Sequence, residues 1–128
     1  MFKYLILMKK KASISREQFI EHYENSHSPL IWSIAPKNRV LYRRNYIVHD
    51  DPLFDIDGRK GQASEFGWDV VTEVGFATRE DAEVAKAAVL ANPENLLRIK
   101  VDEEHFIEPG SVRMLIVETL DTMPTVAS

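Results

Sequence analysis

Four histidines and twenty carboxylates are available in this chain to move a proton near neutral pH. Among them, His27 follows a helical pattern, stands two residues before Pro29 and precedes an apolar run, Leu30 to Trp32. An imidazole titrates near neutral pH, so a histidine where a helix ends beside an apolar wall is a candidate general acid or base. The alternative is that His27 caps the helix by donating to one of its last carbonyl groups.

Asp69 and Glu73 are a second candidate group, because they fall on one side of an alternating segment, residues 67–77. If a second sheet covers that side, the two carboxylates lie in a partly dry cleft and one pKa should rise. The alternative is that Asp69 pairs with Arg43 or Arg44 on a neighbouring strand. We take His27 and Asp69 as the candidate catalytic residues, with Asp69 orienting His27 or acting as its partner acid.

Other side chains are candidates for binding a substrate beside this pair. The phenol of Tyr46 and the guanidinium of Arg44 are good donors to a phenolate or carboxylate, although Tyr46 has a place in the core as its alternative. The remaining candidates are a carboxylate, two aromatic side chains able to wall an apolar pocket, and a histidine: Glu73, Trp32, Phe66 and His105.

Metal and thiol chemistry have little support in the pattern. None of the four histidines forms H-x-x-x-H or an equivalent metal-binding spacing. Asp51, Asp55 and Asp57 suggest calcium, but their loop lacks the glutamate that completes a calcium-binding loop. The absence of cysteine excludes disulfides, thiolate ligands and thiol nucleophiles. We therefore expect chemistry without a bound metal or a thiol.

The strands that must position these residues follow from the apolar patterns. Phe2 to Met8 is apolar on both faces apart from Lys3, which is typical of a central strand. Val40 to His49 has no purely apolar face and suits an edge or an interface. Gly67 to Ala77 alternates, with Trp68 and every second residue after it facing the helices, and Val112 to Leu120 reads as the last strand.

The helices have recognisable ends. A capping box formed by Ser15 and Gln18 begins the first helix, and Pro29 predicts a break at His27 and Ser28, with room for another helical turn between Pro29 and Pro36. Residues 78–91 form a second, alanine-rich helix stopped by Asn92-Pro93. Residues 93–106 predict a further helix, which turns three apolar side chains inward: Leu96, Leu97 and Val101.

The element order β-α-β-β-α-(α)-β predicts an α+β fold, the ferredoxin-like split βαβ arrangement, with helices on one face of a four-stranded antiparallel sheet. Residues 1–128 form a single domain, with a long loop at 50–66 and a frayed tail from about 121. The uncovered sheet face still carries apolar groups, which favours a homodimer of two sheets packed face to face, a dimeric α/β barrel. His27 would lie at the mouth of that barrel.

Composition excludes several classes of partner. A net charge of -4 and an isoelectric point near 5.6 argue against nucleic acid, which requires a basic surface. No apolar run reaches the length of a transmembrane helix, and the first residues resemble a folded strand more than a signal peptide. With 45% hydrophobic and 28% charged residues, the chain is expected to be a cytoplasmic globular domain.

The whole chain resembles the EthD-domain family of the dimeric α/β-barrel superfamily. Three segments carry the resemblance: F-x-x-H-Y-x-x-x-H-S-P-L (Phe19, His22, Tyr23, His27, Ser28, Pro29, Leu30), W-D-V-V-T-E (Trp68, Asp69, Glu73) and D-E-E-H-F (Asp102 to Phe106). His27 matches the family's H-x-P-L histidine, Asp69 its third-strand aspartate, and Asp102 with Phe106 its late D-x-x-x-F. The 50–66 loop is where this chain departs from shorter relatives, and it could form a lid.

The resemblance implies a cleft between sheet and helices that works without a cofactor on a small aromatic or polyketide-like substrate. Members resemble dehydratases, decarboxylases and cyclases, which predicts a cofactor-free lyase. The wider superfamily includes muconolactone isomerases and cofactor-free monooxygenases, so a monooxygenase acting on a phenol or anthrone stays open. The third alternative is a non-catalytic dimer that binds a small hydrophobic molecule or a partner protein.

Overall fold

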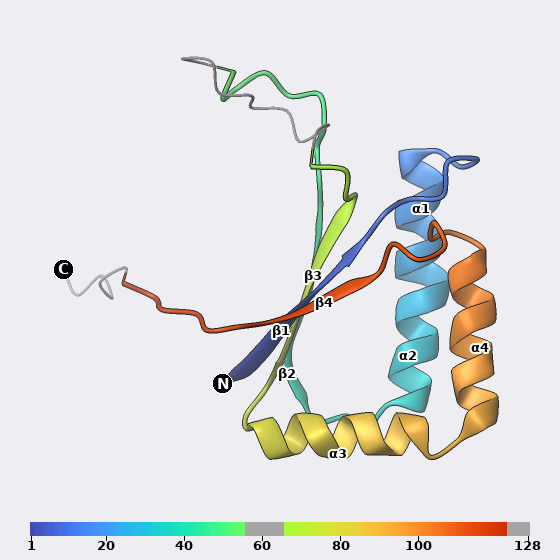
Figure 1. Ribbon diagram of the computed structural model, residues 1–128, viewed down its shortest axis with the longest axis vertical. Coiled ribbons are helices and arrows are strands. Elements are labelled where there is room, and N and C mark those ends of the chain that lie inside the picture. Colours follow the sequence, from blue (N-terminus) through green and yellow to red (C-terminus); the bar gives the residue numbers. More distant parts are fainter. Residues whose placement is uncertain (56–65, 123–128) are drawn as a thin grey trace.

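The computed structural model describes residues 1–55 and 66–122, which form a four-stranded sheet with its helices to one side (Figure 1). The elements follow the order β1 (Phe2–Met8), α1 (Arg16–His22), η1 (Tyr23–His27), α2 (Ser28–Ile34), β2 (Arg39–Tyr46), β3 (Val70–Phe76), α3 (Arg79–Leu90), α4 (Pro93–Glu104) and β4 (Arg113–Val117). The predicted α+β architecture is confirmed.

The sheet has the strand order β2-β3-β1-β4 with antiparallel neighbours throughout. β1 pairs with both β3 and β4, as its two apolar faces predicted, and β2 lies at one edge. Three strands are shorter than expected, among them β4, which runs only from Arg113 to Val117. β2 stops at Tyr46 and β3 starts at Val70, so Asp69 lies just before its strand and not within it.

The helix-facing side of the sheet forms the core. Val70, Thr72, Val74 and Phe76 alternate along β3 and are all at most 2% exposed, as the period of two predicted. The aromatic side chains of Phe19, Tyr23 and Phe106 pack against this side with ring-centroid separations of 5.5–6.4 Å. Because the same aromatic cluster touches strands and helices, it fixes the position of α1, η1 and the end of α4 over the sheet.

The sequence pattern predicted a break of the first helix at His27, and this prediction is wrong. Helical backbone continues from α1 through a wide π-helical turn, η1, and on into α2. Pro29 explains the wide turn, because its nitrogen carries no proton to donate to the carbonyl four residues earlier. The amide of Ser28 donates instead to the carbonyl of Tyr23, five residues back. Pro29 then falls in the first turn of α2, where proline is tolerated.

The later helices agree with their predicted bounds to within about two residues. Thr78 caps α3 by accepting from the amide of Asp81, and Asn92 caps α4 in the same way. The predicted inward face of α4 is partly wrong, because Leu97 and Val101 are 62% and 47% exposed. They line a groove between α2 and α4, described below, and are not part of the core.

Two sequence-based expectations lie partly outside the described residues. The loop at 50–66, with its predicted role as a lid and with Asp57 of the rejected calcium pattern, is described only up to residue 55 and at residue 66. The tail expected to fray from about 121 is described only to residue 122. In the two described ranges, we find no helix long and apolar enough to cross a membrane.

Candidate active site between the sheet and the helices

The wide turn η1 brings three chemically useful side chains to the interior at once. Tyr23, His27 and Ser28 are only 1%, 4% and 9% exposed. A π-helical turn spreads its residues over a wider arc than an α-helical turn, and such turns are frequent at functional sites. The local effect of Pro29 on the backbone is therefore what turns both His27 and its neighbour Ser28 inward.

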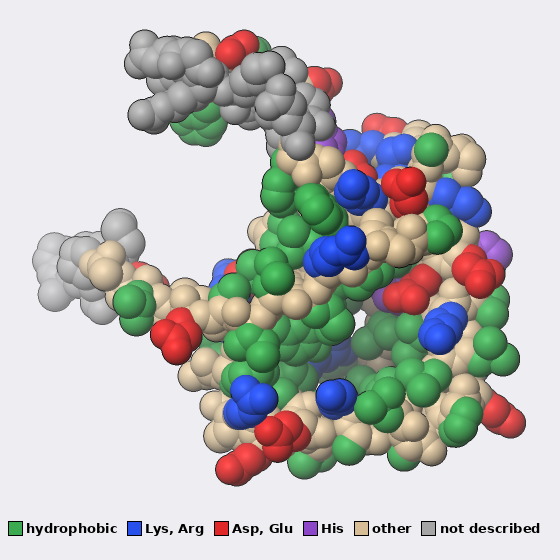
Figure 2. Space-filling view, viewed as in Figure 1, with side chains coloured by type: hydrophobic (Ala, Val, Ile, Leu, Met, Phe, Trp, Pro, Cys, Tyr) green, Lys and Arg blue, Asp and Glu red, His purple; other side chains and the backbone are tan. Residues whose placement is uncertain are grey.

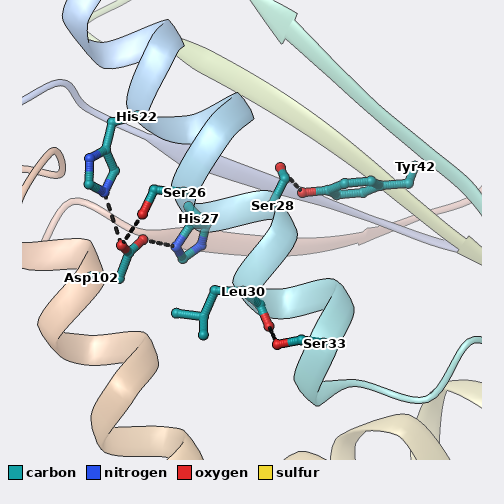
Figure 3. A network of polar contacts seen from close by, with 8 residues as sticks. All are labelled: His22, Ser26, His27, Ser28, Leu30, Ser33, Tyr42 and Asp102. Carbon is teal, nitrogen blue, oxygen red and sulfur yellow. Dashed lines mark hydrogen bonds and ion pairs between the residues drawn. The ribbon is translucent and has the colours of Figure 1, made fainter.

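The imidazole of His27 is held by a carboxylate from α4. Nδ1 of His27 lies 2.9 Å from Oδ2 of Asp102 (Figure 3). The other carboxylate oxygen accepts from Oγ of Ser26 at 2.7 Å and contacts Nε2 of His22 at 3.0 Å. Asp102 thus joins two histidines and a serine of the first helical segment to α4, and it fixes the orientation of the buried ring.

The charges of this pair follow from burial and hydrogen bonding. Burial lowers the pKa of His27 and outweighs the opposing effect of the Asp102 carboxylate. Burial by itself would raise the pKa of Asp102, but the hydrogen bonds from Ser26 and His27 prevail and lower it. Near pH 7, Asp102 is therefore ionised and His27 neutral. An ionised carboxylate only accepts, so Nδ1 of His27 carries the proton and Nε2 carries the lone pair.

The surroundings of His27 are aromatic. Its ring lies 5.0 Å from the ring of Phe106 and 5.5 Å from that of Tyr23, measured between centroids. Among the residues that the structure describes, none hydrogen-bonds to Nε2. The ring is thus anchored on one nitrogen, and the other is a free base.

Two pairs of hydroxyl groups join the helical segment around His27 to the sheet. Oγ of Ser28 lies 2.8 Å from the phenol oxygen of Tyr42 on β2 (Figure 3). The phenol of Tyr23 lies 2.6 Å from Oγ1 of Thr72 on β3, and burial raises the pKa of Tyr23 far above its usual range. The phenol of Tyr23 therefore stays protonated near neutral pH, and hydroxyl groups such as these can donate to an oxyanion.

The space-filling view shows a hollow between the strands and the helices, above α3, with mainly hydrophobic side chains on its walls (Figure 2). A separate open groove of about 680 Å³ lies between α2 and α4. Its lining is partly apolar, with Leu30, Leu97 and Val101, and it reaches Asp102 and His105. The groove therefore reaches the carboxylate of the pair, while the His27 ring lies behind it and is only 4% exposed.

The predicted pairing of Asp69 with His27 is wrong. Oδ1 of Asp69 lies 2.9 Å from Nε2 of His49, and Oδ2 accepts from the backbone amide of Lys10 at 2.6 Å. Asp69 lies directly before β3. Its carboxylate therefore connects the start of β3 to the residues that follow β1 and β2. The alternative pairing of Asp69 with Arg43 or Arg44 does not occur either.

Arg44 and Tyr46 share a partner that the sequence did not indicate. The carboxylate of Glu24 in η1 accepts hydrogen bonds from Nε of Arg44 at 2.8 Å and from Nη2 of the same side chain. It also accepts one from the phenol of Tyr46. The bond from Arg44 lowers the pKa of Glu24, so the carboxylate is ionised. The proposed oxyanion-binding pair is therefore engaged in holding β2 to the helix.

Glu73 lies on the uncovered face of the sheet. Its carboxylate contacts Lys3 at 2.7 Å, Arg43 at 3.0 Å and Asn45 at 3.0 Å. Hydrogen bonds from Lys3, Asn45 and Arg43 lower the pKa of Glu73 to about 2. The sequence-based expectation that one carboxylate of this pair has a raised pKa is thus wrong for Glu73. Because Val70, Thr72, Val74 and Phe76 face the helices, the register of β3 turns Glu73 away from the cleft on the helical side.

The three remaining candidates lie at the periphery. Trp32 is 48% exposed on α2, and Lys37 and Arg39 stack over its ring at 4.5 and 5.3 Å. Phe66 is 43% exposed and contacts Trp68, whose indole donates to the carbonyl of Ser111. His105 lines the groove between α2 and α4, with its ring 5.7 Å from that of His22.

Sequence reasoning did not assign Asp102, Ser28 or Tyr42 to the site. Asp102 was available through its match to the late D-x-x-x-F segment, but its partner was not, because 75 residues separate it from His27. Tyr42 shares a strand face with Arg44 and Tyr46, which was the signal for its inward position. In the described ranges, no group of three or more histidine, aspartate or glutamate side chains is arranged to hold a metal ion.

Comparison with known proteins identifies the family. A family model for the EthD domain matches residues 11–110. A search of curated proteins found no match. Among solved structures, the chain is similar to an ethyl tert-butyl ether D (EthD) family protein from Bacillus halodurans, with 18% identity, a TM-score of 0.57 and coverage of 94% of this chain and 100% of that one.

Two further solved structures share the fold. One is a protein from Arabidopsis thaliana, with 14% identity, a TM-score of 0.57 and coverage of 97% and 100% of the two chains. The other, from Bacteroides fragilis, is described as a dimeric protein of unknown function with a ferredoxin-like fold, at 12% identity, a TM-score of 0.51 and coverage of 92% and 95%. Since the family model spans most of its length, the chain belongs to the EthD domain family.

Proposed function

We propose that this chain is a cofactor-free enzyme in which His27 acts as the general base on a small aromatic or polyketide-like compound. The observation that carries the proposal is the buried His27–Asp102 pair at 2.9 Å, which leaves the lone pair on Nε2. A base of this kind suits lyase chemistry, the loss of water or carbon dioxide or a ring closure, because each of these begins or ends with a proton transfer.

The neighbouring groups support such a reaction. When Nε2 takes a proton from the substrate, the ionised Asp102 stabilises the imidazolium that forms. The negative charge then grows on a substrate oxygen, and the hydroxyl groups of Ser28 and Tyr42 are donors for that charge. The imidazolium next returns its proton to the carbon or to the leaving oxygen. Leu30, Leu97 and Val101 line the groove that reaches Asp102, which favours a substrate with an apolar body.

We also propose that the chain works as a homodimer through the uncovered face of its sheet. The Bacteroides fragilis protein of similar fold is described as dimeric. On the uncovered side of this chain, Leu5 of β1 lies opposite Leu115 of β4, which is 49% exposed. Burying such a face against a second copy removes apolar surface from water.

The test of the proposed chemistry compares two histidine–carboxylate pairs. Purified chain is incubated with phenols that carry keto or carboxyl side chains, and products are followed by mass spectrometry. For a compound that turns over, His27→Asn should lower kcat by roughly 10²–10⁴-fold, because the general base is lost. His49→Asn is the matched control, since His49 forms an equivalent contact with Asp69 and should leave kcat unchanged.

Three outcomes would contradict the proposal. Full turnover by His27→Asn removes His27 as the base. Loss of turnover without oxygen points to a monooxygenase. Binding of the same compounds with no product from the wild-type chain indicates a binding protein without catalysis. In each case, circular dichroism of both variants verifies that the fold is intact.

A further inference from the structure

Arg39, the first residue of β2, differs from the other two arginines of that strand in the partners of its guanidinium. Its Nε and Nη2 atoms are buried, and in the described part of the chain no residue accepts a hydrogen bond from either. Two other arginines of the same strand are satisfied: Arg43 pairs with Glu73 and Arg44 with Glu24. Buried donors in folded proteins nearly always have partners, so this unpaired cation calls for an explanation.

The position of Arg39 connects it to the candidate site. Its guanidinium stacks on the ring of Tyr42 at 4.4 Å, while Arg44 stacks on the same ring at 4.4 Å. The phenol of Tyr42 reaches Ser28, the residue after His27. Burial raises the pKa of Tyr4, and the charge of Arg39 opposes that rise, so Arg39 is close to the helical side of β1 as well.

The chemistry of the unpaired atoms indicates which ligand they would bind. Nε and Nη2 form one edge of the planar guanidinium and donate in parallel, which matches the two oxygens of a carboxylate. The surrounding rings of Tyr42 and Trp32 are aromatic and lower the polarity around the charge. An unpaired cation in such surroundings favours an anion attached to an apolar body.

We propose that Arg39 is a carboxylate-binding residue, and that the substrate of the site is an aromatic or polyketide-like carboxylic acid whose acid group is held by the Nε–Nη2 edge. This rests on the proposed function in one respect, namely that the same ligand extends along Tyr42 and Ser28 to His27. Trp32 covers the guanidinium at 5.3 Å and is half exposed, so its indole moves aside as the carboxylate enters.

The test is an NMR titration of the full-length chain with benzoate as the probe and benzamide as its uncharged equivalent. The Nε–H signal of Arg39, identified by its loss in Arg39→Gln, should move downfield with benzoate and stay in place with benzamide. The indole signal of Trp32 should move with it, whereas that of Trp68, which is bonded to Ser111, should not.

Variants separate the site from general charge effects. Arg39→Gln should weaken benzoate binding at least tenfold, and Arg39→Lys should weaken it less, because it keeps the charge but loses the fork. Arg43→Gln is the matched control: it removes the same charge from the opposite face of the same strand, where the side chain is 62% exposed. It should bind benzoate like the wild type.

The proposal is overturned if benzoate fails to shift the Arg39 signal, if Arg39→Gln binds benzoate as tightly as wild type, or if chloride and phosphate compete as well as carboxylates do. The experiment needs no turnover, so it is independent of the acid–base claim. His27→Asn should keep the Arg39 response. If benzoate does not shift the Arg39 signal but His27→Asn abolishes turnover, only the proposed carboxylate site is wrong. If benzoate shifts the Arg39 signal but His27→Asn keeps full turnover, only the assignment of His27 as the base is wrong.

Discussion

His27 is the residue on which the account depends, and its environment predicts a pH effect on stability. Burial holds its pKa in the folded state below the usual value of about 6.5. Between the folded and the unfolded pKa, the unfolded chain binds more protons, so the free energy of unfolding falls as the pH drops below about 6.5. Urea unfolding of wild type at pH 7 and pH 5 should show this loss.

His27→Asn supplies the comparison for this effect. An asparagine amide can still donate to Asp102 but does not titrate, so the difference in unfolding free energy between pH 7 and pH 5 should shrink. An equal pH dependence in the variant and the wild type would assign the effect to other groups. Carboxylates with lowered pKa values, such as Glu73, change the unfolding free energy only below about pH 4.5. They therefore do not contribute to the difference between pH 7 and pH 5.

The buried hydrogen bond between Tyr23 and Thr72 gives a second prediction at the residue scale. Tyr23→Phe leaves the hydroxyl of Thr72, which is 0% exposed, without its partner. This should destabilise the fold by about 1–3 kcal/mol, measured by urea unfolding. In Tyr23→Phe with Thr72→Val, both polar groups are gone, so the loss should be smaller than the sum of the single losses. Additive losses would show that the two hydroxyls are not coupled.

At the scale of elements, the capping box of α1 can be tested separately from the site. Oγ of Ser15 accepts from the amide of Gln18, and the side chain of Gln18 accepts from the amide of Ser15. Ser15→Ala should cost about 1 kcal/mol of unfolding free energy. Ser33→Ala is the control, because Ser33 is exposed and bonds only its own helix. Equal effects of the two substitutions would contradict a specific role for the cap.

The sequence predicted most elements because their signals are local. The capping residues Ser15 and Thr78, the period of two in β3 and the apolar β1 all act within a few residues. The first helix was predicted to end too early because Pro29 is a local breaker, while the packing of Tyr23 and His27 against Phe106 holds the backbone helical. Tertiary packing therefore outweighed local propensity there.

The site was harder to predict than the fold because its partners come from different elements. His27 could be chosen by its type and position, but its carboxylate depends on how α4 docks on η1, which no short pattern encodes. Asp69 failed as the partner since β3 begins one residue after it and His49 lies within reach. Likewise, Glu24 was not expected to engage Arg44 and Tyr46.

For the whole molecule, the uncovered sheet face makes a prediction about assembly. Leu115 is 49% exposed on that face, and its neighbour Met114 is 62% exposed on the helical side of the same strand. Leu115→Glu should convert the proposed dimer to a monomer, because it places a charge in an apolar interface. Met114→Glu, an equal change on the other face, should keep the dimer. Light scattering after gel filtration gives both masses, and a monomeric wild type would contradict the proposal.

The central claim, that a buried and neutral His27 is held by Asp102 and offers Nε2 as a base, can be tested directly by ¹⁵N NMR of the imidazole nitrogens during a pH titration. The account predicts a proton on Nδ1 near pH 7 and a pKa below 6.5. In Asp102→Asn the pKa should fall further, because the carboxylate that favours the charged ring is gone. A proton on Nε2, or a pKa above 6.5 in the wild type, would show that His27 is not the base.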